Sequence, residues 1–172
     1  MLKKIISGGQ TGVDRAALDV AISLSLLYGG WCPKGRLDEN GIIPNQYINL
    51  VEVKGDFQTE EDNYAARTKL NICDAHGTLI LLPSSSIKET LQDGTLLTLK
   101  EVKRQKKSSF LIDLTTEPEN ILEQCRDWLK KNHIEILNVA GPRESSWPGI
   151  YQRSYSYLHA LLQHMDFKRD ST

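Results

Sequence analysis

Apolar residues follow two different spacings along this chain. A continuous apolar run bounded by turn residues occurs at 77–82, and a mostly apolar segment at 134–140 is predicted to be the last central strand. Such runs are typical of strands in a parallel sheet that is covered on both faces. A second spacing, with apolar residues at steps of four and three, occurs at Val13, Ala17, Val20, Leu24 and Leu27. This spacing predicts a helix over 12–27. Strands that alternate with helices in this way predict an α/β fold with a mostly parallel sheet.

The same two spacings predict the remaining elements. Further strands are expected up to Ile6 and at 28–32, 50–53 and 110–114, and helices from about 59, 94, 118 and 149. Residues 37–47 show neither spacing and are predicted to form an ordered surface loop, and loops of this length are often functional. We expect a single domain over 1–165 and a frayed polar tail over 166–172.

Three loops that each follow a strand and precede a helix carry unusual polar content. They cover residues 7–14, 84–95 and 141–146. Because crossovers between parallel strands are right-handed, all three loops are expected at one edge of the sheet. Arg15, Arg67 and Arg143 would converge there, and Arg suits planar contacts with phosphate-like oxygens. The sequence therefore predicts a pocket for an anion at this edge.

The first of these loops holds Gly8, Gly9 and Gly12 within five residues. Glycine permits a positive φ and a close approach of the backbone to a ligand. A helix N-terminus also offers N–H groups and a partial positive charge to an anion. Asp14, in the first helical turn, either complements the helix dipole or orients a ligand or Arg15. The loop is neither a P-loop, since no Lys-Ser or Lys-Thr follows, nor a dinucleotide fingerprint.

Other polar residues near strand ends have two readings each. Lys34 and Arg36 are candidates for an anion contact, or they form a solvated basic turn. Thr95 and Thr98, in the first turn of a helix, cap that helix or bind a ligand. Cys32 is either a soft thiolate near the site or a packed core thiol.

Composition narrows the classes of function. The net charge of −1 gives no electrostatic case for nucleic acid or an anionic membrane, and no apolar run approaches the length of a membrane span. The N-terminal apolar stretch is too short for a signal peptide and reads as the first strand. Three widely spaced cysteines favour free thiols and a cytoplasmic location. His, Cys and Asp show no metal-ligand spacing, so no metal-ligating residue is predicted.

A family resemblance becomes visible in the first polar loop. Residues 7–19, Ser-Gly-Gly-Gln-Thr-Gly-Val-Asp-Arg-Ala-Ala-Leu-Asp, resemble the signature of the molybdenum carrier family, whose members include molybdenum cofactor carrier proteins. Residues 30–36, 64–68 and 139–145, and Asp74 with 77–80, are similar to later blocks of that family. The resemblance spans roughly residues 5–162.

The resemblance implies a fold, a ligand and an assembly. The family is similar to a Rossmann-like group that includes the cytokinin-activating phosphoribohydrolases, often labelled lysine decarboxylases. It implies a three-layer, doubly wound, mostly parallel sheet with helices on both faces, and self-association as a dimer or tetramer. The expected ligand is the molybdenum cofactor (molybdopterin), molybdate or a nucleotide, with its phosphate on 8–12 and on the turn at 94–95. The candidate ligand-binding residues are Ser7, Gly8, Gly9, Gln10, Thr11, Gly12, Asp14, Arg15, Lys34, Arg36, Arg67, Asp74, Gly94, Thr95, Thr98, Gly141, Arg143, Glu144 and Ser145.

The chain departs from the phosphoribohydrolases at one motif. Those enzymes carry Pro-Gly-Gly-x-Gly-Thr-x-x-Glu with a catalytic Glu, whereas this chain has Asp93 before Gly-Thr and Thr98 in place of the Glu. Without that carboxylate the general acid–base group is missing. We therefore expect a binding protein with no catalytic residues. The alternatives are a nucleotide hydrolase using Asp14, Glu101 or Glu144, and a nucleotide-sensing regulatory protein.

Overall fold

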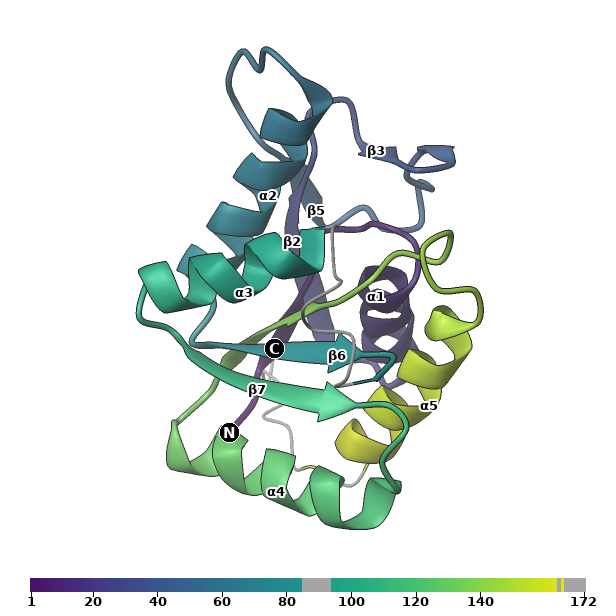
Figure 1. Cartoon of the computed structure of the whole chain (residues 1–172), viewed down its shortest axis with the longest axis vertical. Coiled ribbons are helices and arrows are strands. Elements are labelled where there is room, and N and C mark those ends of the chain that lie inside the picture. Colours follow the sequence, from purple (N-terminus) through teal and green to yellow (C-terminus); the bar gives the residue numbers. More distant parts are fainter. Residues whose placement is uncertain (85–93, 164, 166–172) are drawn as a thin grey trace.

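The computed structural model describes residues 1–84, 94–163 and 165 (Figure 1). Its main sheet has six strands in the order β5-β2-β1-β8-β6-β7, and every neighbouring pair is parallel. The strands are β1 (Lys4–Ile6), β2 (Leu27–Cys32), β5 (Leu50–Glu52), β6 (Gly77–Leu82), β7 (Ser108–Asp113) and β8 (Ile136–Ala140). A separate antiparallel hairpin consists of β3 (Leu37–Asp38) and β4 (Gly41–Ile42).

Helices cover both faces of the sheet. They are α1 (Val13–Ser23), α2 (Glu60–Asp74), α3 (Gly94–Arg104), α4 (Pro118–Lys131) and α5 (Ile150–Leu162). Helix α5 packs on α1 and α4, whereas α2 and α3 pack on each other at the opposite face (Figure 1). This is a three-layer, doubly wound parallel sheet, so the fold class predicted from the sequence is confirmed. None of the helices described is both long enough and apolar enough to cross a membrane.

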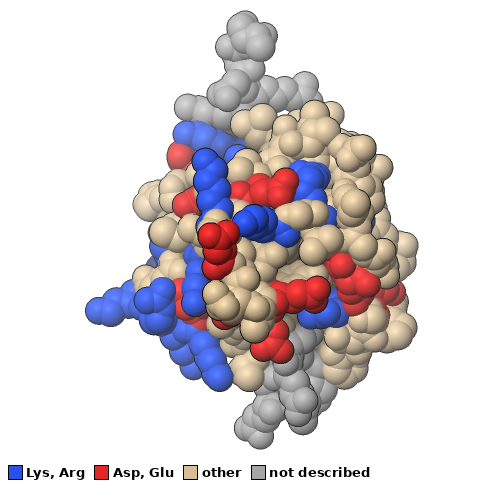
Figure 2. Space-filling view, turned by 90° about the horizontal axis from the view of Figure 1, so that it is seen from above, with Lys and Arg blue, Asp and Glu red and all other residues tan. Residues whose placement is uncertain are grey.

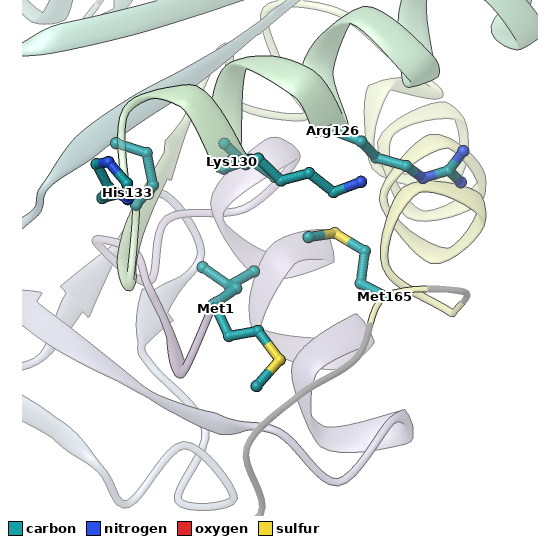
Figure 3. Close-up of a pocket in the computed structure, with 8 residues that line it drawn as sticks. Met1, Arg126, Lys130, His133 and Met165 are labelled. Carbon is teal, nitrogen blue, oxygen red and sulfur yellow. The ribbon is translucent and has the colours of Figure 1, made fainter.

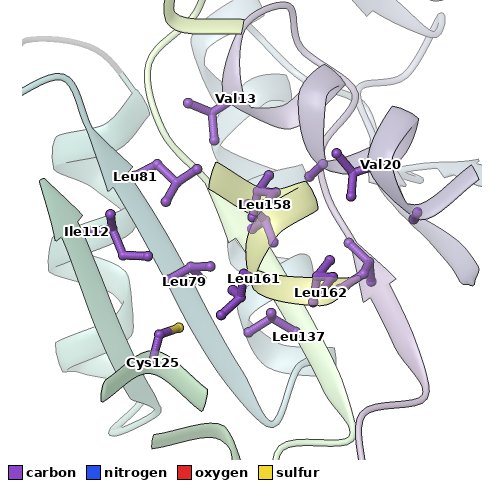
Figure 4. Packing of buried hydrophobic residues seen from close by; sticks show 14 of the residues in the cluster. Val13, Val20, Leu79, Leu81, Ile112, Cys125, Leu137, Leu158, Leu161 and Leu162 are labelled. Carbon is purple, nitrogen blue, oxygen red and sulfur yellow. The ribbon is translucent and has the colours of Figure 1, made fainter. Parts of the chain in front are cut away.

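The principal core lies between the sheet and the layer formed by α1, α4 and α5. Figure 4 shows Leu79, Leu81 and Leu137 of the central strands facing Leu158 and Leu161 of α5. All five side chains are buried. Helix α3 covers the other face of β6, where Ile80 and Leu82 are buried. Because both faces of β6 are covered, the strand has a run of apolar residues without alternation. The core therefore fixes the strand ends from which the polar loops leave.

The sheet has a switch point between the neighbouring strands β8 and β6. Helix α3 follows β6 along the chain and helix α5 follows β8, and these two helices lie on opposite faces of the sheet. Ligands of open α/β sheets bind outside the carboxyl ends of the strands at such a switch point. The loop after β1 lies next to it, because β1 pairs with β8. The topology therefore predicts a ligand site at the carboxyl ends of β1, β6 and β8.

The first helix is shorter than the sequence pattern predicted. It ends at Ser23 and not at 27, and Leu27 begins β2. Ser25 has a φ of 56°, and its N–H donates to Ile22 O. The N–H of the next residue bonds to Ala21 O, which completes a left-handed C-terminal cap. The apolar spacing continued past this cap because the following residues enter a strand that is also partly buried.

Other boundaries differ by a few residues. Strand β8 begins at Ile136 where 134 was predicted, and α5 begins at Ile150 where a start near 149 was predicted. The region 37–47, predicted as a loop, contains the β3–β4 hairpin and places Ile43 and Tyr47 in a small core cluster with Cys32. Burial raises the pKa of the Cys32 thiol, which fits a packed core residue.

Candidate functional site

A small cleft lies at the switch point of the sheet. Its volume is about 30 Å³, close to the share of one water molecule in the liquid. Loops or helix starts after β1, β6 and β8 supply its walls, and α2 closes one side. Its lining residues are Gln10, Asp14, Arg67, Thr68, Gly94, Thr98, Ala140, Gly141 and Arg143. All of these except Thr68 and Ala140 are among the residues singled out from the sequence.

A buried ion pair forms one wall of the cleft. Arg67 Nη1 of α2 lies 2.7 Å from Asp14 Oδ2, and the Asp14 side chain is only 3% exposed. The backbone N–H of Gln10 also donates to this carboxylate at 3.3 Å. The guanidinium lies against Gly8, where a Cβ atom would come within 1.6 Å of Nη1. Gly8 is therefore required by the protein's own ion pair.

Three polar groups along the cleft have unused hydrogen-bonding capacity. Within residues 1–84 and 94–163, Gln10 Nε2 and Arg67 Nε are buried donors with no hydrogen-bond partner. Leaving a buried donor unpaired costs about 1–3 kcal/mol. In the same part of the chain, Arg143 forms no ion pair. The cleft thus collects donors that an external acceptor would satisfy.

The glycine-rich loop packs closely against other parts of the protein. Gly9 and Gly12 have φ values of 77° and 72°, in the left-handed region that favours glycine. A Cβ on Gly12 would lie 2.5 Å from Pro142 O, and one on Gly9 would lie 2.8 Å from Leu50 Cδ1. The close approaches seen at these glycines are therefore contacts with the chain itself.

The β3–β4 hairpin closes over the glycine-rich loop through two acidic residues. Asp38 Oδ2 lies 2.7 Å from Arg15 Nη2, which also donates to Gly9 O at 3.0 Å. The same guanidinium stacks over the Tyr47 ring, 4.6 Å from its centroid. Arg15 is thus engaged by the hairpin and by its own loop.

Glu39 is the second acidic residue of the hairpin, and it joins two of the polar loops. Its carboxylate accepts hydrogen bonds from the hydroxyls of Thr11 and Ser145 and, at 3.1 Å, from the Ser145 N–H. Partial burial raises the pKa of Glu39, but these hydrogen bonds and the charge of Arg143 outweigh it, so the net pKa is lowered. We refer to Glu39, Thr11 and Ser145 as the Glu39 cluster.

Glu39 also contacts a residue of the cleft. Its backbone N–H donates to Gln10 Oε1 at 2.9 Å, and the Thr11 N–H donates to the same oxygen at 3.0 Å. With Oε1 held in this way, Nε2, which has no partner among the described residues, is the end of the Gln10 amide left for a ligand. The sequence reading did not select Glu39, and the only signal was its place in the long loop 37–47.

The two basic residues after β2 lie outside the cleft lining. Arg36 donates to Leu50 O at 3.1 Å and to Tyr47 O at 3.0 Å. Lys34 Nζ donates to Gly55 O at 2.8 Å. Both cations therefore hold backbone carbonyls of the segment 47–55.

Three further candidates make hydrogen bonds within the protein. Ser7 Oγ donates to Val139 O at 2.7 Å, so it joins β1 to β8. Asp74 lies at the end of α2, near the start of β6, and accepts from Trp31 Nε1 at 2.7 Å. Glu144 accepts from two backbone N–H groups at the start of α5 and so caps that helix.

The second polar loop predicted from the sequence, residues 84–95, is described only in part. Residues 85–93, including Asp93, lie outside the described residues. Gly94 and Thr98 of α3 line the cleft, and the Thr98 hydroxyl donates to Gly94 O at 2.9 Å. Thr95 is buried in the same turn.

The carboxylates considered for a hydrolase are bonded to other groups. Asp14 pairs with Arg67, and Glu144 caps α5. Glu101 is buried, and hydrogen bonds from Arg104 lower its pKa to about 2. Among the described residues, no group of three or more His, Cys, Asp or Glu side chains is placed to hold a metal ion.

A larger cavity lies elsewhere and is built differently. Its volume is about 280 Å³, and its lining includes Met1, Lys130, His133 and Met165 (Figure 3). It lies near the start of β1 and the end of α4, away from the carboxyl ends of the strands. Arg126 at its rim donates to carbonyls of α5. We therefore place the candidate site in the smaller cleft, where unsatisfied donors gather.

Charges of both signs are interleaved around the hairpin. Figure 2 looks down on the end of the molecule that carries β3 and the start of α2, and it shows acidic side chains among the basic ones. Among the described residues on this face, basic side chains gather at the lower left of the view and charges of both signs alternate elsewhere. Attraction of an anion to the cleft would therefore depend on individual donors and not on a basic patch.

Comparison with known proteins shows the family of this chain. Residues 5–162 match the model of the circularly permutated YpsA SLOG family, and the chain belongs to that family. The chain is also similar to the crystal structure of the putative molybdenum carrier protein from Syntrophus aciditrophicus, with 41% identity and a TM-score of 0.83. That match covers 94% of this chain and 95% of the other. No curated protein matches the sequence.

Proposed function

We propose that this protein binds a small oxyanion at the switch-point cleft, with molybdate or the anionic end of the molybdenum cofactor as the first candidates. The observation that carries the proposal is the convergence of three donors on one cleft: Gln10 Nε2, Arg67 Nε and the guanidinium of Arg143. Guanidinium and amide N–H groups are suited to the oxygens of such ions. The molybdenum carrier name of the similar structure supports the choice of anion.

The size of the cleft bears on which part of a ligand enters it. At about 30 Å³ it holds a group of water size, far below the roughly 300 Å³ of a typical small-molecule pocket. A free tetrahedral oxyanion needs a modest adjustment of side chains. A pterin or a nucleotide would place only its phosphate here. Molybdate and a cofactor phosphate share this chemistry, so titrations with each distinguish them.

A direct test uses Arg143, which has no ion-pair partner among the described residues and lines the cleft. Isothermal titration should show binding of molybdate or of the molybdenum cofactor to the wild type. Arg143→Ala should weaken that binding by about 1.5–3 kcal/mol, because one charge-assisted contact is lost. Arg153→Ala is the matched control, since Arg153 is exposed on α5 outside the cleft.

Two results would refute this proposal. One is the absence of any heat or thermal shift with molybdate, phosphate, the cofactor or a nucleoside monophosphate. The other is an affinity that Arg143→Ala leaves unchanged. Self-association and a cytoplasmic location, which the sequence reading expected, stay predictions, as does the absence of catalysis.

A further inference from the structure

The Glu39 carboxylate lies among donors that the sequence reading assigned to a ligand. It accepts hydrogen bonds from the Thr11 hydroxyl, the Ser145 hydroxyl and the Ser145 N–H. These donors come from the loops after β1 and β8, at the carboxyl edge of the sheet. A carboxylate oxygen in such surroundings has the charge and the acceptor capacity of an oxyanion oxygen.

The cluster adjoins the candidate cleft through Gln10. Gln10 is 6% exposed, its Oε1 accepts from the Glu39 N–H, and its Nε2 has no partner within the described ranges 1–84 and 94–163. This buried, unsatisfied donor is an observation independent of the cluster, and it points to a ligand on the same side. Arg143 is two residues from Ser145 and lines the cleft.

We propose that Glu39 is a built-in competitor for the anion: its carboxylate occupies an oxyanion position between Thr11 and Ser145, and the bound ligand displaces it. The inference rests on the function proposed above. Displacement breaks the bonds that hold the β3–β4 hairpin to the loop after β8. Part of the ligand's binding free energy is therefore used to release the hairpin, so the carboxylate limits the affinity of the site.

The first test removes the charge of Glu39 and keeps its size. Glu39→Gln should bind inorganic phosphate and molybdate at least about tenfold more tightly than the wild type, because a competing anion near Arg143 is gone. Glu123→Gln is the control for net charge, since Glu123 is exposed on α4. An affinity of Glu39→Gln equal to or weaker than that of the wild type would overturn the inference.

A second test needs no variant. Hydrogen exchange of residues 36–43 in the wild type should become faster when molybdate saturates the site, because the hairpin has lost its bonds to Thr11 and Ser145. A ligand that merely adds contacts would slow exchange there. Slower or unchanged exchange at saturation would therefore contradict displacement of Glu39.

The outcomes separate this inference from the proposed function. If neither the wild type nor Glu39→Gln binds phosphate, molybdate or the cofactor, both proposals fail. If the wild type binds an anion and Arg143→Ala weakens it, while Glu39→Gln is no tighter, the proposed function stands and the competitor role of Glu39 fails.

Discussion

Substitution of Gly8 by Ala tests the buried ion pair beside the cleft. A Cβ at position 8 would lie 1.6 Å from Arg67 Nη1, 2.4 Å from its Cζ and 2.8 Å from its Cδ. The backbone of Gly8 has no positive φ, so Ala itself fits the local conformation. The whole cost of the change must therefore come from the displacement of the Arg67 side chain.

The magnitude follows from what that displacement exposes. Moving Arg67 leaves the Asp14 carboxylate, whose side chain is 3% exposed, without its cation at 2.7 Å. Loss of one partner of a buried pair costs about 3–5 kcal/mol. The Gln10 N–H still donates to Asp14, and the Arg67 side chain is 14% exposed, so it has a route toward solvent. We expect Gly8→Ala to lower the free energy of unfolding by about 2–4 kcal/mol.

Urea denaturation of a double-mutant cycle measures this coupling. In the Arg67→Ala background, Gly8→Ala should cost almost nothing, because the clashing side chain is absent. Gly94→Ala is the matched control, since no atom within the described structure lies within 4 Å of a Cβ there. Costs of Gly8→Ala that agree within about 0.5 kcal/mol in the two backgrounds would refute the reasoning.

Two further predictions concern stability. The Ser154 hydroxyl in α5 is fully buried and has no partner within the described ranges. Ser154→Ala should therefore raise the free energy of unfolding by roughly 0.5–1 kcal/mol. Ser154→Val should lower the free energy of unfolding by about 1–3 kcal/mol, because the larger side chain overpacks the site. Urea melts check both, and a destabilised Ser154→Ala would contradict the reading. Glu101 has a folded pKa of about 2, below its unfolded value, so its stabilisation is present above about pH 5 and is lost as the pH falls toward 2. Because Arg104 is 69% exposed, we expect Glu101→Gln to cost only about 1 kcal/mol at neutral pH and almost nothing near pH 2, and a pH-independent difference would refute this.

Local pattern was enough to predict most elements of the fold. The continuous apolar run of β6 and the Pro118 start of α4 predicted elements that the structure contains. The predicted start of a helix near 59 is also confirmed, since α2 begins at Glu60 and the Thr59 hydroxyl accepts from the Asp62 N–H at 3.1 Å. These signals act over a few residues, so they are readable without tertiary information. The predicted end of α1 was wrong, because a serine in the left-handed conformation, such as Ser25, has no distinctive sequence signal.

The candidate site could be predicted only at the level of loops. The crossover rule correctly brought the loops after β1 and β8 to one edge, and Gln10, Arg67 and Arg143 line one cleft there. The crossover rule gave no information on which charged side chains form ion pairs with each other. Glu39 went unselected because its partners are 28 and 106 residues away in the chain.

The sequence by itself determined the alternation of strands and helices, the parallel sheet and the edge at which polar loops gather. These features follow from hydrophobic spacing and chain connectivity, which are properties of the linear order. Only the tertiary structure decided that Arg67 satisfies Asp14, that the glycines accommodate the protein's own atoms and that Glu39 lies among the loop donors. Hydrogen bonds and ion pairs depend on distances of about 3 Å between atoms, and folding sets those distances by packing segments that are remote in sequence.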